Sequence, residues 1–545
     1  MAVDGRALGA VTEVPTGRRI ARAPWPPAMV WVPAALVAGA MVLPLVYLFL
    51  RTFGVGTEVW DLLFRTRTLE IVTRSAILIV AVTGASIAIA VPLAWLTVRA
   101  DLPLRRLWAV LTALPLVIPS YVAGFLVVVA LGPRGMLQQL LAGPLGVERL
   151  PEIYGFPGAM LTLTLLSYPY VLLTVRAALW RLDPSLEEAS RGLGYGAWTT
   201  FRRVTLPLLR PAIAAGALLV ALYTLSDFGA VSLLRYETFT WAIYLQYESA
   251  FDRTLAAGLS LVLVAVALGI LVTEARTRGR SQYYRSTVGV AHPPSLVRLG
   301  RWRWPAFAFC TAIVLLALAV PMSVLSYWVV RGIAAGEPLL LLWSAARNSV
   351  YVSGLAAGVA LAAGLPVAIL TVRYPGWFSA LLERMTYVGF ALPGIVIALA
   401  LVFFGANFAA PLYQTLGLLI FAYLVLFLPA AVGAVRASLL QVSPRLEEAA
   451  RSLGRSPFQV LATVTLPLVR SGILAGAALV FLLTMKELPA TLILGPIGFK
   501  TLATSIWSAA SEAFFAQAAA PALLLIVVSS IPLALLMLRQ GRWQP

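Results

Sequence analysis

Long apolar runs separated by short polar segments fill the chain between residues 28 and 538. A helix needs about 20 apolar residues, each rising about 1.5 Å, to cross the roughly 30 Å hydrocarbon layer of a membrane. The pattern therefore predicts an all-α polytopic membrane protein with about 12 transmembrane helices. The predicted spans lie near residues 28–50, 75–98, 108–131, 157–179, 209–230, 255–273, 306–330, 349–372, 385–405, 412–435, 470–494 and 516–538.

One polar stretch between these runs occurs twice. Residues 187–216 read EEASRGLGYGAWTTFRRVTLPLLRPAIAAG and residues 447–476 read EEAARSLGRSPFQVLATVTLPLVRSGILAG, with 15 of 30 aligned positions identical. The match extends upstream, where PLAWLTVR ends at Arg99 and PVAILTVR ends at Arg373. Each half has an even number of predicted spans, so the halves are expected to be parallel repeats with a solute path between them.

Each copy carries the signals of a short helix that starts before it. The signals are an N-cap oxygen followed by proline (Asp183-Pro184, Ser443-Pro444) and a glycine suited to a left-handed helix end (Gly194, Gly454). The expected helices, 183–194 and 443–454, are about 15 Å long and so too short to cross a membrane. A catalytic role for the paired glutamates is disfavoured because adjacent helical residues do not face each other.

Composition and charge narrow the function. The chain has 545 residues, 61% apolar and 12% charged, with mean hydropathy +0.91 and net charge +19, whereas soluble domains carry about 25% charged residues. The arginines cluster at the ends of apolar runs, so the positive-inside rule explains the charge and a nucleic-acid partner is not expected. Cys310 is the one cysteine and His292 the one histidine, which excludes an internal disulfide and a histidine-rich metal site.

The basic segments all fall on one side of the predicted topology, which places the N- and C-termini in the cytoplasm. Residues 274–304 are the most basic connection, and a cytoplasmic tether is favoured there over a site for anionic lipid. The predicted organisation is a cytoplasmic tail (1–27), a first half (28–273), a basic linker (274–304), a second half (305–538) and a cytoplasmic C-terminus (539–545).

The repeated stretch resembles the E-A-A-x3-G-x9-I-x-L-P signature of permease subunits of binding-protein-dependent ATP-binding cassette (ABC) importers. Ser190 replaces one alanine of the signature, and valine replaces isoleucine in both copies. The resemblance implies the type I importer permease fold, with each short helix docking on an ATP-hydrolysing subunit. The implied ATPase-coupling residues are Glu187, Glu188, Ala189, Gly194, Leu206 and Pro207, and Glu447, Glu448, Ala449, Gly454, Leu466 and Pro467.

No G-K-[ST] tripeptide occurs in the chain, so a phosphate-binding P-loop is not expected here. ATP and Mg²⁺ are then expected on a separate ATPase subunit, with no cofactor and no catalytic residue in this chain. The resemblance implies a multi-pass protein of the bacterial inner membrane, in contact with membrane lipid. Its expected partners are two copies of an ABC ATPase and a periplasmic or lipid-anchored solute-binding protein.

Two acidic residues fall at equivalent positions near the outer ends of matching spans, Asp227 and Glu487. Ionisable groups in spans often mark an ion path, and hard cations prefer carboxylate oxygen. The alternative is that both acids pair locally, Glu487 with Lys486. The sequence around both acids is similar to that of ferric-iron permeases. This resemblance makes both acids candidate residues of the translocation path that contact Fe³⁺ transiently, and it does not define a stable metal site. Thiamine, aminoethylphosphonate, polyamine and sulfate permeases are the alternatives within the family.

Two function classes compete with an importer permease. A secondary transporter driven by an ion gradient also has parallel halves, but it leaves the repeated polar helices without a use. A membrane enzyme needs a constellation of histidine, aspartate, serine or cysteine that the sequence does not offer. Dependence of transport on ATP and on a co-purifying ATPase separates these classes.

Overall fold

The computed structural model describes residues 26–53, 65–249, 254–277, 296–336 and 340–541. Within these ranges the chain is helical, and its one β feature is an isolated bridge between Ala100 and Val297. The predicted tail (except residues 26 and 27), most of the basic linker and His292 lie outside the described residues.

Ten helices among the described residues are long and apolar enough to cross a membrane, and α18 and the stretch Phe515–Ile531 of α25 are shorter apolar helices. The predicted all-α polytopic class is thereby confirmed. The main helices are α1 (Ala28–Phe53), α3 (Thr66–Arg99), α5 (Ser120–Leu131), α7 (Phe156–Arg181), α10 (Leu206–Ser226), α13 (Thr254–Thr277), α14 (Arg303–Val314), α15 (Val320–Ala334), α16 (Leu340–Arg373), α18 (Gly394–Phe408), α19 (Leu416–Leu439), α22 (Leu466–Met485) and α25 (Phe515–Gly541).

The third predicted span of each half is broken. Residues 108–131 form parts of α4 (Arg105–Leu111), η1 (Leu114–Val117) and α5, and residues 385–405 form parts of α17 (Trp377–Tyr387), η5 (Val388–Ala391) and α18. Pro119 and Pro393 occupy the N-cap positions of α5 and α18, and the residue before each is extended. Proline disfavours helical geometry in the residue before it. Each half therefore presents the N-terminus of a helix inside the protein.

The fifth predicted spans also end early. The helix α10 stops at Ser226 instead of residue 230, and α22 stops at Met485 instead of residue 494. Short helices follow each stop, namely α11 (Gly229–Leu233) and α12 (Phe239–Ser249) in the first half and α23 (Pro489–Leu494) and α24 (Leu502–Ser511) in the second. Asp227 and Glu487 thus stand at breaks between helices.

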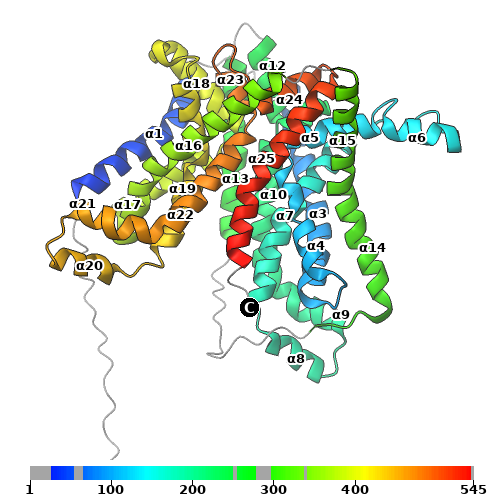
Figure 1. Cartoon of the computed structure of the whole chain (residues 1–545), viewed down its shortest axis with the longest axis horizontal. Helices are drawn as coiled ribbons and strands as arrows, with labels where there is room; N and C mark the ends of the chain where they lie inside the picture. Colours follow the sequence, from blue (N-terminus) through cyan, green and yellow to red (C-terminus); the bar gives the residue numbers. More distant parts are fainter. Residues whose placement is uncertain (1–25, 54–64, 250–253, 278–295, 337–339, 542–545) are drawn as a thin grey trace, which may run out of the picture.

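The first helix of each half packs on the other half. The ring of Trp31 in α1 meets Phe378 of α17 edge to face at 6.2 Å, and the Tyr47 hydroxyl donates to the Phe403 carbonyl of α18 at 3.3 Å. In return, Phe307 of α14 packs edge to face against Trp108 of α4 at 5.3 Å. Figure 1 shows α1 beside α16 and α17, and α14 beside α4. The two repeats are therefore interlocked.

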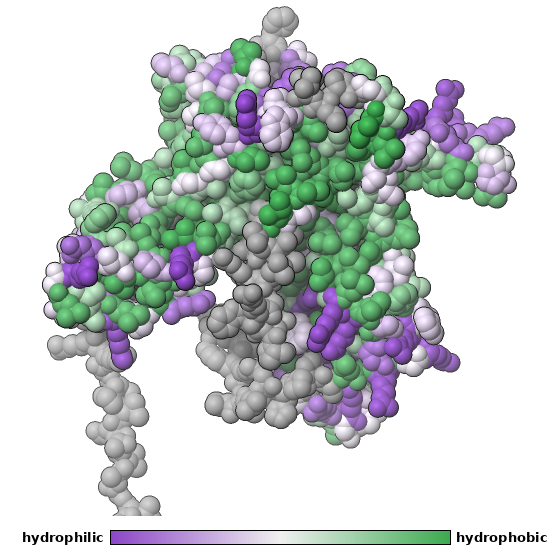
Figure 2. Space-filling model, in the orientation of Figure 1, coloured by the Kyte–Doolittle hydropathy of each residue, from purple (hydrophilic) through white to green (hydrophobic). Residues whose placement is uncertain are grey.

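The molecule has one end where the halves meet and one where they separate (Figure 1). The helices α5, α11, α12, α23 and α24 gather at the first, which we call the closed end. At the other, the open end, α8 (Pro184–Gly192) and α20 (Pro444–Ser452) lie at the tips of separate arms. Figure 2 shows hydrophobic side chains along both flanks and hydrophilic ones near the two ends, as expected of a chain that crosses a bilayer.

A close helix contact in the first half gives a test of the packing. A Cβ on Gly216 of α10 would lie 2.6 Å from the Cα of Val171 in α7, whereas nothing lies within 4 Å of a Cβ on Gly84 of α3. Overpacking a helix interface costs about 1–3 kcal/mol. We expect Gly216→Ala to lower the melting temperature of the detergent-purified protein and Gly84→Ala to leave it unchanged or raise it. Equal melting temperatures would contradict the α7–α10 contact.

Candidate coupling site and translocation path

The repeated polar stretches fold as helices at the open end. The helix α8 begins at Pro184 behind the N-cap residue Asp183, whose carboxylate accepts from the backbone N–H of Ser185 at 3.0 Å. The helix α20 begins at Pro444 behind Ser443, whose hydroxyl makes no capping hydrogen bond. The expected N-cap oxygen is therefore used in the first copy only. In the second copy, Pro444 favours the start of the helix, because proline has no backbone N–H that would need a hydrogen-bond acceptor there.

The helices α8 and α20 end at Gly192 and Ser452, two residues before the glycines predicted to end them, Gly194 and Gly454. Their φ angles are +86° and +85°, a left-handed conformation that glycine adopts without strain. The Gly194 N–H donates to the Arg191 carbonyl at 2.9 Å, and the next residue donates back to Ser190 at 3.3 Å. This bonding satisfies carbonyls that the last helical turn leaves free. Nothing lies within 4 Å of a Cβ on either glycine, so both turns face open space.

The two glutamates at the start of each copy have different surroundings. Glu187 and Glu447 are only 4% and 5% exposed, whereas Glu188 and Glu448 are exposed. Residues adjacent on a helix point about 100° apart, so one carboxylate of each pair faces the protein and the other faces outward. Glu188 and Glu448 are accessible to a partner, and Glu187 and Glu447 contact the arginines of their own halves.

The remaining predicted coupling residues lie around the same two tips. Ala189 and Ala449 are exposed beside the outward glutamates. The Leu-Pro pairs lie at the first turn of the next helix: Leu206, Pro207 and Leu466 are half-buried, and Pro467 is exposed. The structure thus brings each set of six together at one tip of the open end.

Apolar side chains that the motif does not include surround each tip. Leu193 and Leu453 are 78% and 84% exposed, and Trp198 and Phe458 are exposed at matching positions after them. Clustered exposed apolar side chains mark protein contact sites. The sequence does indicate these positions, because large apolar residues occur at the same places in both copies. Trp198 and Phe458 were missed because the two copies were compared by identical residues only, and these two differ.

Asp227 and Glu487 occupy matching places at the closed end. The Asp227 carboxylate is buried and accepts from the N–H groups of Ala230 at 3.0 Å and Val231 at 3.2 Å, and Glu487 accepts from Ala490 at 3.1 Å. Each acid therefore caps the short helix that follows it, where a carboxylate is stabilised by the unpaired N–H groups and the helix dipole. Their role as path residues remains a prediction.

The same acids lie against the broken third spans. A Cβ on Gly394, the first residue of α18, would lie 2.5 Å from Oε1 of Glu487. A Cβ on Gly229, two residues after Asp227, would lie 2.9 Å from Oγ of Ser120, the first residue of α5. Each half thus sets an acid near the N-terminus of an interrupted span, an arrangement that favours negative charge there.

Side chains of both halves join at the closed end. Trp507 of α24 donates through Nε1 to Oγ of Ser232 in α11 at 3.1 Å, and its ring lies 5.8 Å from the rings of Phe228 and Tyr244. The Lys486 ammonium donates to the Leu116 carbonyl of η1 at 2.8 Å. Lys486 therefore binds across the interface and not to Glu487, the local partner that the sequence offered.

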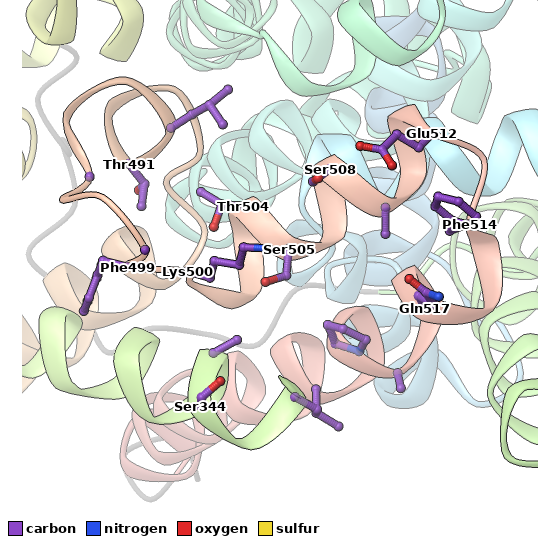
Figure 3. Close-up of a pocket in the computed structure, with 18 of the residues that line it drawn as sticks. Ser344, Thr491, Phe499, Lys500, Thr504, Ser505, Ser508, Glu512, Phe514 and Gln517 are labelled. Carbon is purple, nitrogen blue, oxygen red and sulfur yellow. The ribbon is translucent and has the colours of Figure 1, made fainter. Parts of the chain in front are cut away.

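A cavity of about 600 Å³ lies near the closed end, among α16, α23, α24 and α25 (Figure 3). Its lining is mixed in charge and polarity, with Lys500, Glu512 and several hydroxyl groups. Thr491 on its wall donates to the carbonyl of Glu487 at 2.7 Å. Thr491 therefore connects the cavity wall to the backbone of Glu487, at the break after α22.

These features define a class of integral membrane transport component: a polytopic helical chain with interlocked repeats, a closed end and twin exposed helices at the other end. The family model described as binding-protein-dependent transport system inner membrane component matches residues 86–278 and 354–543. The chain belongs to this family, and it carries the family's unit twice.

Relatives match one half or both. The Fe(3+)-transport system permease protein FbpB 2 of Haemophilus influenzae is 39% identical over 506 residues, covering 92% of this chain and 96% of that protein. The ferric transport system permease protein FbpB of Actinobacillus pleuropneumoniae is 27% identical over 442 residues, covering 77% of this chain and 64% of that protein. The molybdenum transport system permease protein ModB of Escherichia coli is 35% identical over 188 residues, covering 33% of this chain and 81% of that protein.

The closed end can be tested through the contact between Trp507 and Ser232. The one native cysteine, Cys310, is fully buried, so Ser232→Cys provides a thiol against a low background. We expect this thiol to react slowly with a membrane-impermeant maleimide, and several-fold faster when Trp507→Ala removes the ring, because local opening exposes buried groups. Trp304→Ala, which alters an exposed tryptophan of α14, is the control. Equal labelling rates in all three proteins would contradict the assignment of Trp507 to the closure.

Proposed function

We propose that this chain is the permease subunit of an ATP-driven importer, that it forms the translocation path between its two halves, and that its solute is ferric iron. The observation that carries the transport mechanism is the pair of matching exposed helices, α8 and α20, at one end of a membrane-spanning chain. The solute rests on the relative of nearly equal length whose name gives Fe(3+) transport.

Each short helix offers one docking surface, so the assembly contains two copies of an ABC ATPase for each copy of this chain. Outward glutamates and large apolar side chains, such as Leu193 and Leu453, provide each surface. ATP and Mg²⁺ bind to the partner subunits, where hydrolysis takes place, and this chain carries no cofactor of its own. The open end faces the cytoplasm of a bacterial cell, in agreement with the positive-inside rule, and both termini are assigned to the cytoplasm on the same ground.

The opposite, closed end faces a periplasmic or lipid-anchored solute-binding protein. In the described conformation the halves meet at this end and diverge toward α8 and α20 (Figure 1), which corresponds to a state open to the cytoplasm. When the ATPase subunits close, α8 and α20 approach each other. The halves then rock about their interface, separate at Trp507 and Lys486, and admit the solute.

Asp227 and Glu487 are the carboxylates of this path. Hard cations such as Fe³⁺ favour oxygen ligands, and both acids stand at breaks in spans, where polar backbone is tolerated when it lines a cavity. Their bonds to backbone N–H groups are made in the closed arrangement and are free to rearrange when the halves separate. A molybdenum, sulfate, thiamine, aminoethylphosphonate or polyamine solute is less well supported, because three relatives that match across both halves carry ferric names.

The direct experiment is uptake of radiolabelled ferric iron into proteoliposomes that contain this chain with its ATPase, supplied with the loaded binding protein. We expect uptake to require ATP inside the vesicles and to stop with vanadate. Uptake that is insensitive to vanadate but is abolished by an ionophore would indicate a gradient-driven carrier. ATP-dependent uptake of another solute, with none of iron, would retain the mechanism and reject the solute.

A bulky side chain at the end of a short helix tests docking. Gly194→Trp and Gly454→Trp place an indole in the open space beside each tip and strain a left-handed turn. We expect uptake to fall by about tenfold or more, as when the centre of a protein interface is disrupted, while membrane insertion persists. Gly146→Trp alters a left-handed glycine with equal free space at the end of α6 (Met136–Leu145), away from both tips, and serves as the control. Wild-type uptake in both tip variants would count against docking at α8 and α20.

A further inference from the structure

The helix α20 is attached to the protein by polar contacts. Of its nine residues, all within the described part of the chain, Glu447 is the one that is buried. Isolated helices shorter than about 12–15 residues are marginal, and most gain stability by packing an apolar face. Leu446 and Leu453 of this segment face solvent instead. Its position therefore depends on what holds Glu447.

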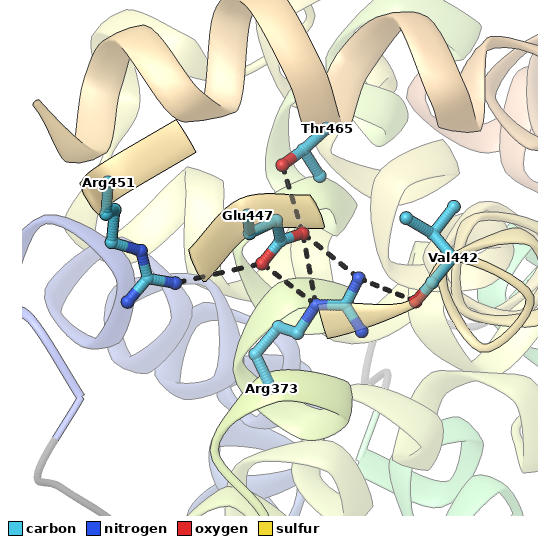
Figure 4. A network of polar contacts seen from close by, with 5 residues as sticks. All are labelled: Arg373, Val442, Glu447, Arg451 and Thr465. Atoms are coloured by element: carbon cyan, nitrogen blue, oxygen red, sulfur yellow. Dashed lines mark hydrogen bonds and ion pairs between the residues drawn. The ribbon is translucent and has the colours of Figure 1, made fainter. Parts of the chain in front are cut away.

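Three groups converge on the Glu447 carboxylate, namely the Arg373 guanidinium, the Thr465 hydroxyl and the Arg451 guanidinium, whose Nη2 lies 3.9 Å from Oε2 (Figure 4). Nε of Arg373 donates to both carboxylate oxygens at 3.2 Å, and its Nη2 donates to Oε1 at 3.0 Å and to the Val442 carbonyl at 3.2 Å. The Thr465 hydroxyl donates to Oε1 at 3.1 Å. A planar guanidinium that meets a carboxylate through two nitrogens fixes orientation as well as distance.

The first half repeats this arrangement in a looser form. The Thr205 hydroxyl donates to Oε1 of Glu187 at 2.9 Å, and Nε of Arg99 lies 3.9 Å from the same oxygen. Arg99 is 1% exposed, and its Nη2 donates to the carbonyls of Leu179 and Leu182 at 3.2 and 3.3 Å. The same three residue types thus meet in both halves.

Each arginine joins elements that are separate in the sequence. Arg373 is the last residue of α16, Val442 follows α19, and Thr465 ends the π-helical turn η7 (Leu461–Thr465) that leads into α22. The first-half counterparts are the end of α3, the end of α7 and the turn η2 (Phe201–Thr205) before α10. A displacement of either short helix is therefore applied to three spans at once.

The geometry points to a positioning role, which rests on the proposed function. We name Arg373, Glu447 and Thr465 the second-half anchor, and Arg99, Glu187 and Thr205 the first-half anchor. Each anchor fixes its short helix rigidly to three spans, so that movement of the ATPase reaches the path and is not absorbed by pivoting of the helix. The anchoring glutamate is the one before the glutamate of the repeated motif, whose own side chain faces outward.

Stability alone does not account for the anchors. A buried ion pair is often no more stabilising than apolar residues of the same volume, whereas removal of one partner leaves an uncompensated charge. The double variant Arg373→Met/Glu447→Met therefore keeps the fold and removes the directional attachment. This property separates a positioning role from a structural one.

The measurement is the amount of solute moved per ATP hydrolysed by the reconstituted complex. We expect the double variant to co-purify with the ATPase and to melt close to the wild type, while the ratio falls by about tenfold, within the usual range of coupling between sites. The matched control is Arg436→Met/Glu383→Met. It removes a 3.5 Å Arg–Glu pair between α19 and α17 that does not involve α20, and it is expected to keep the wild-type ratio.

The outcomes distinguish the two proposals. Absence of ATP-dependent uptake in the wild type rejects the proposed function. Coupled uptake in the wild type with an equal ratio in the double variant overturns the anchor and leaves the proposed function standing. Should the double variant fail to assemble, Thr465→Val removes one hydrogen bond and keeps both charges. A several-fold lower ratio in Thr465→Val supports the anchor, and a wild-type ratio overturns it.

Discussion

A buried carboxylate requires partners that hydrogen-bond to it or carry the opposite charge, and the attachment of α8 and α20 depends on this constraint. Each helix has nine residues, fewer than an isolated helix needs to be stable, and its buried glutamate, Glu187 or Glu447, lies beside an arginine. In both halves this arginine is the last residue of a long helix, Arg99 of α3 and Arg373 of α16. The ion pair therefore links each exposed short helix to a helix that crosses the membrane.

The open end and the closed end differ in which side chains they expose and in how their polar groups are satisfied. At the open end, exposed leucines and aromatic residues surround helices that the chain does not cover. At the closed end, interrupted spans bring polar backbone and two acids inside, and each acid is satisfied by N–H groups of the helix that follows it. Polar groups inside a membrane require such internal partners. The first end thus presents apolar side chains to the surroundings, and the second satisfies its two acids from within the chain.

Much of the local structure was accessible from sequence. The repeat predicted both short helices, and Gly194 and Gly454 adopt the left-handed conformation that their positions indicated. The hydropathy pattern located the spans but not their breaks at Pro119 and Pro393, because an apolar run has the same hydropathy whether its helix is continuous or interrupted. The exchange of α1 and α14 between the halves was not predictable, since a uniformly apolar helix does not encode which neighbour it packs on. Likewise, the binding of Lys486 to Leu116 depends on tertiary proximity across 370 positions of sequence.

The central claim is that α8 and α20 transmit movement from ATPase subunits to the halves of the path. Distances between nitroxide labels at Ser185→Cys and Arg445→Cys test it, since both sites are exposed at matching positions and the native Cys310 is buried. Pulsed electron paramagnetic resonance on the assembled complex is predicted to give a shorter distance with ATP trapped than without nucleotide. An identical distance in both states, in a complex that transports, would contradict the account.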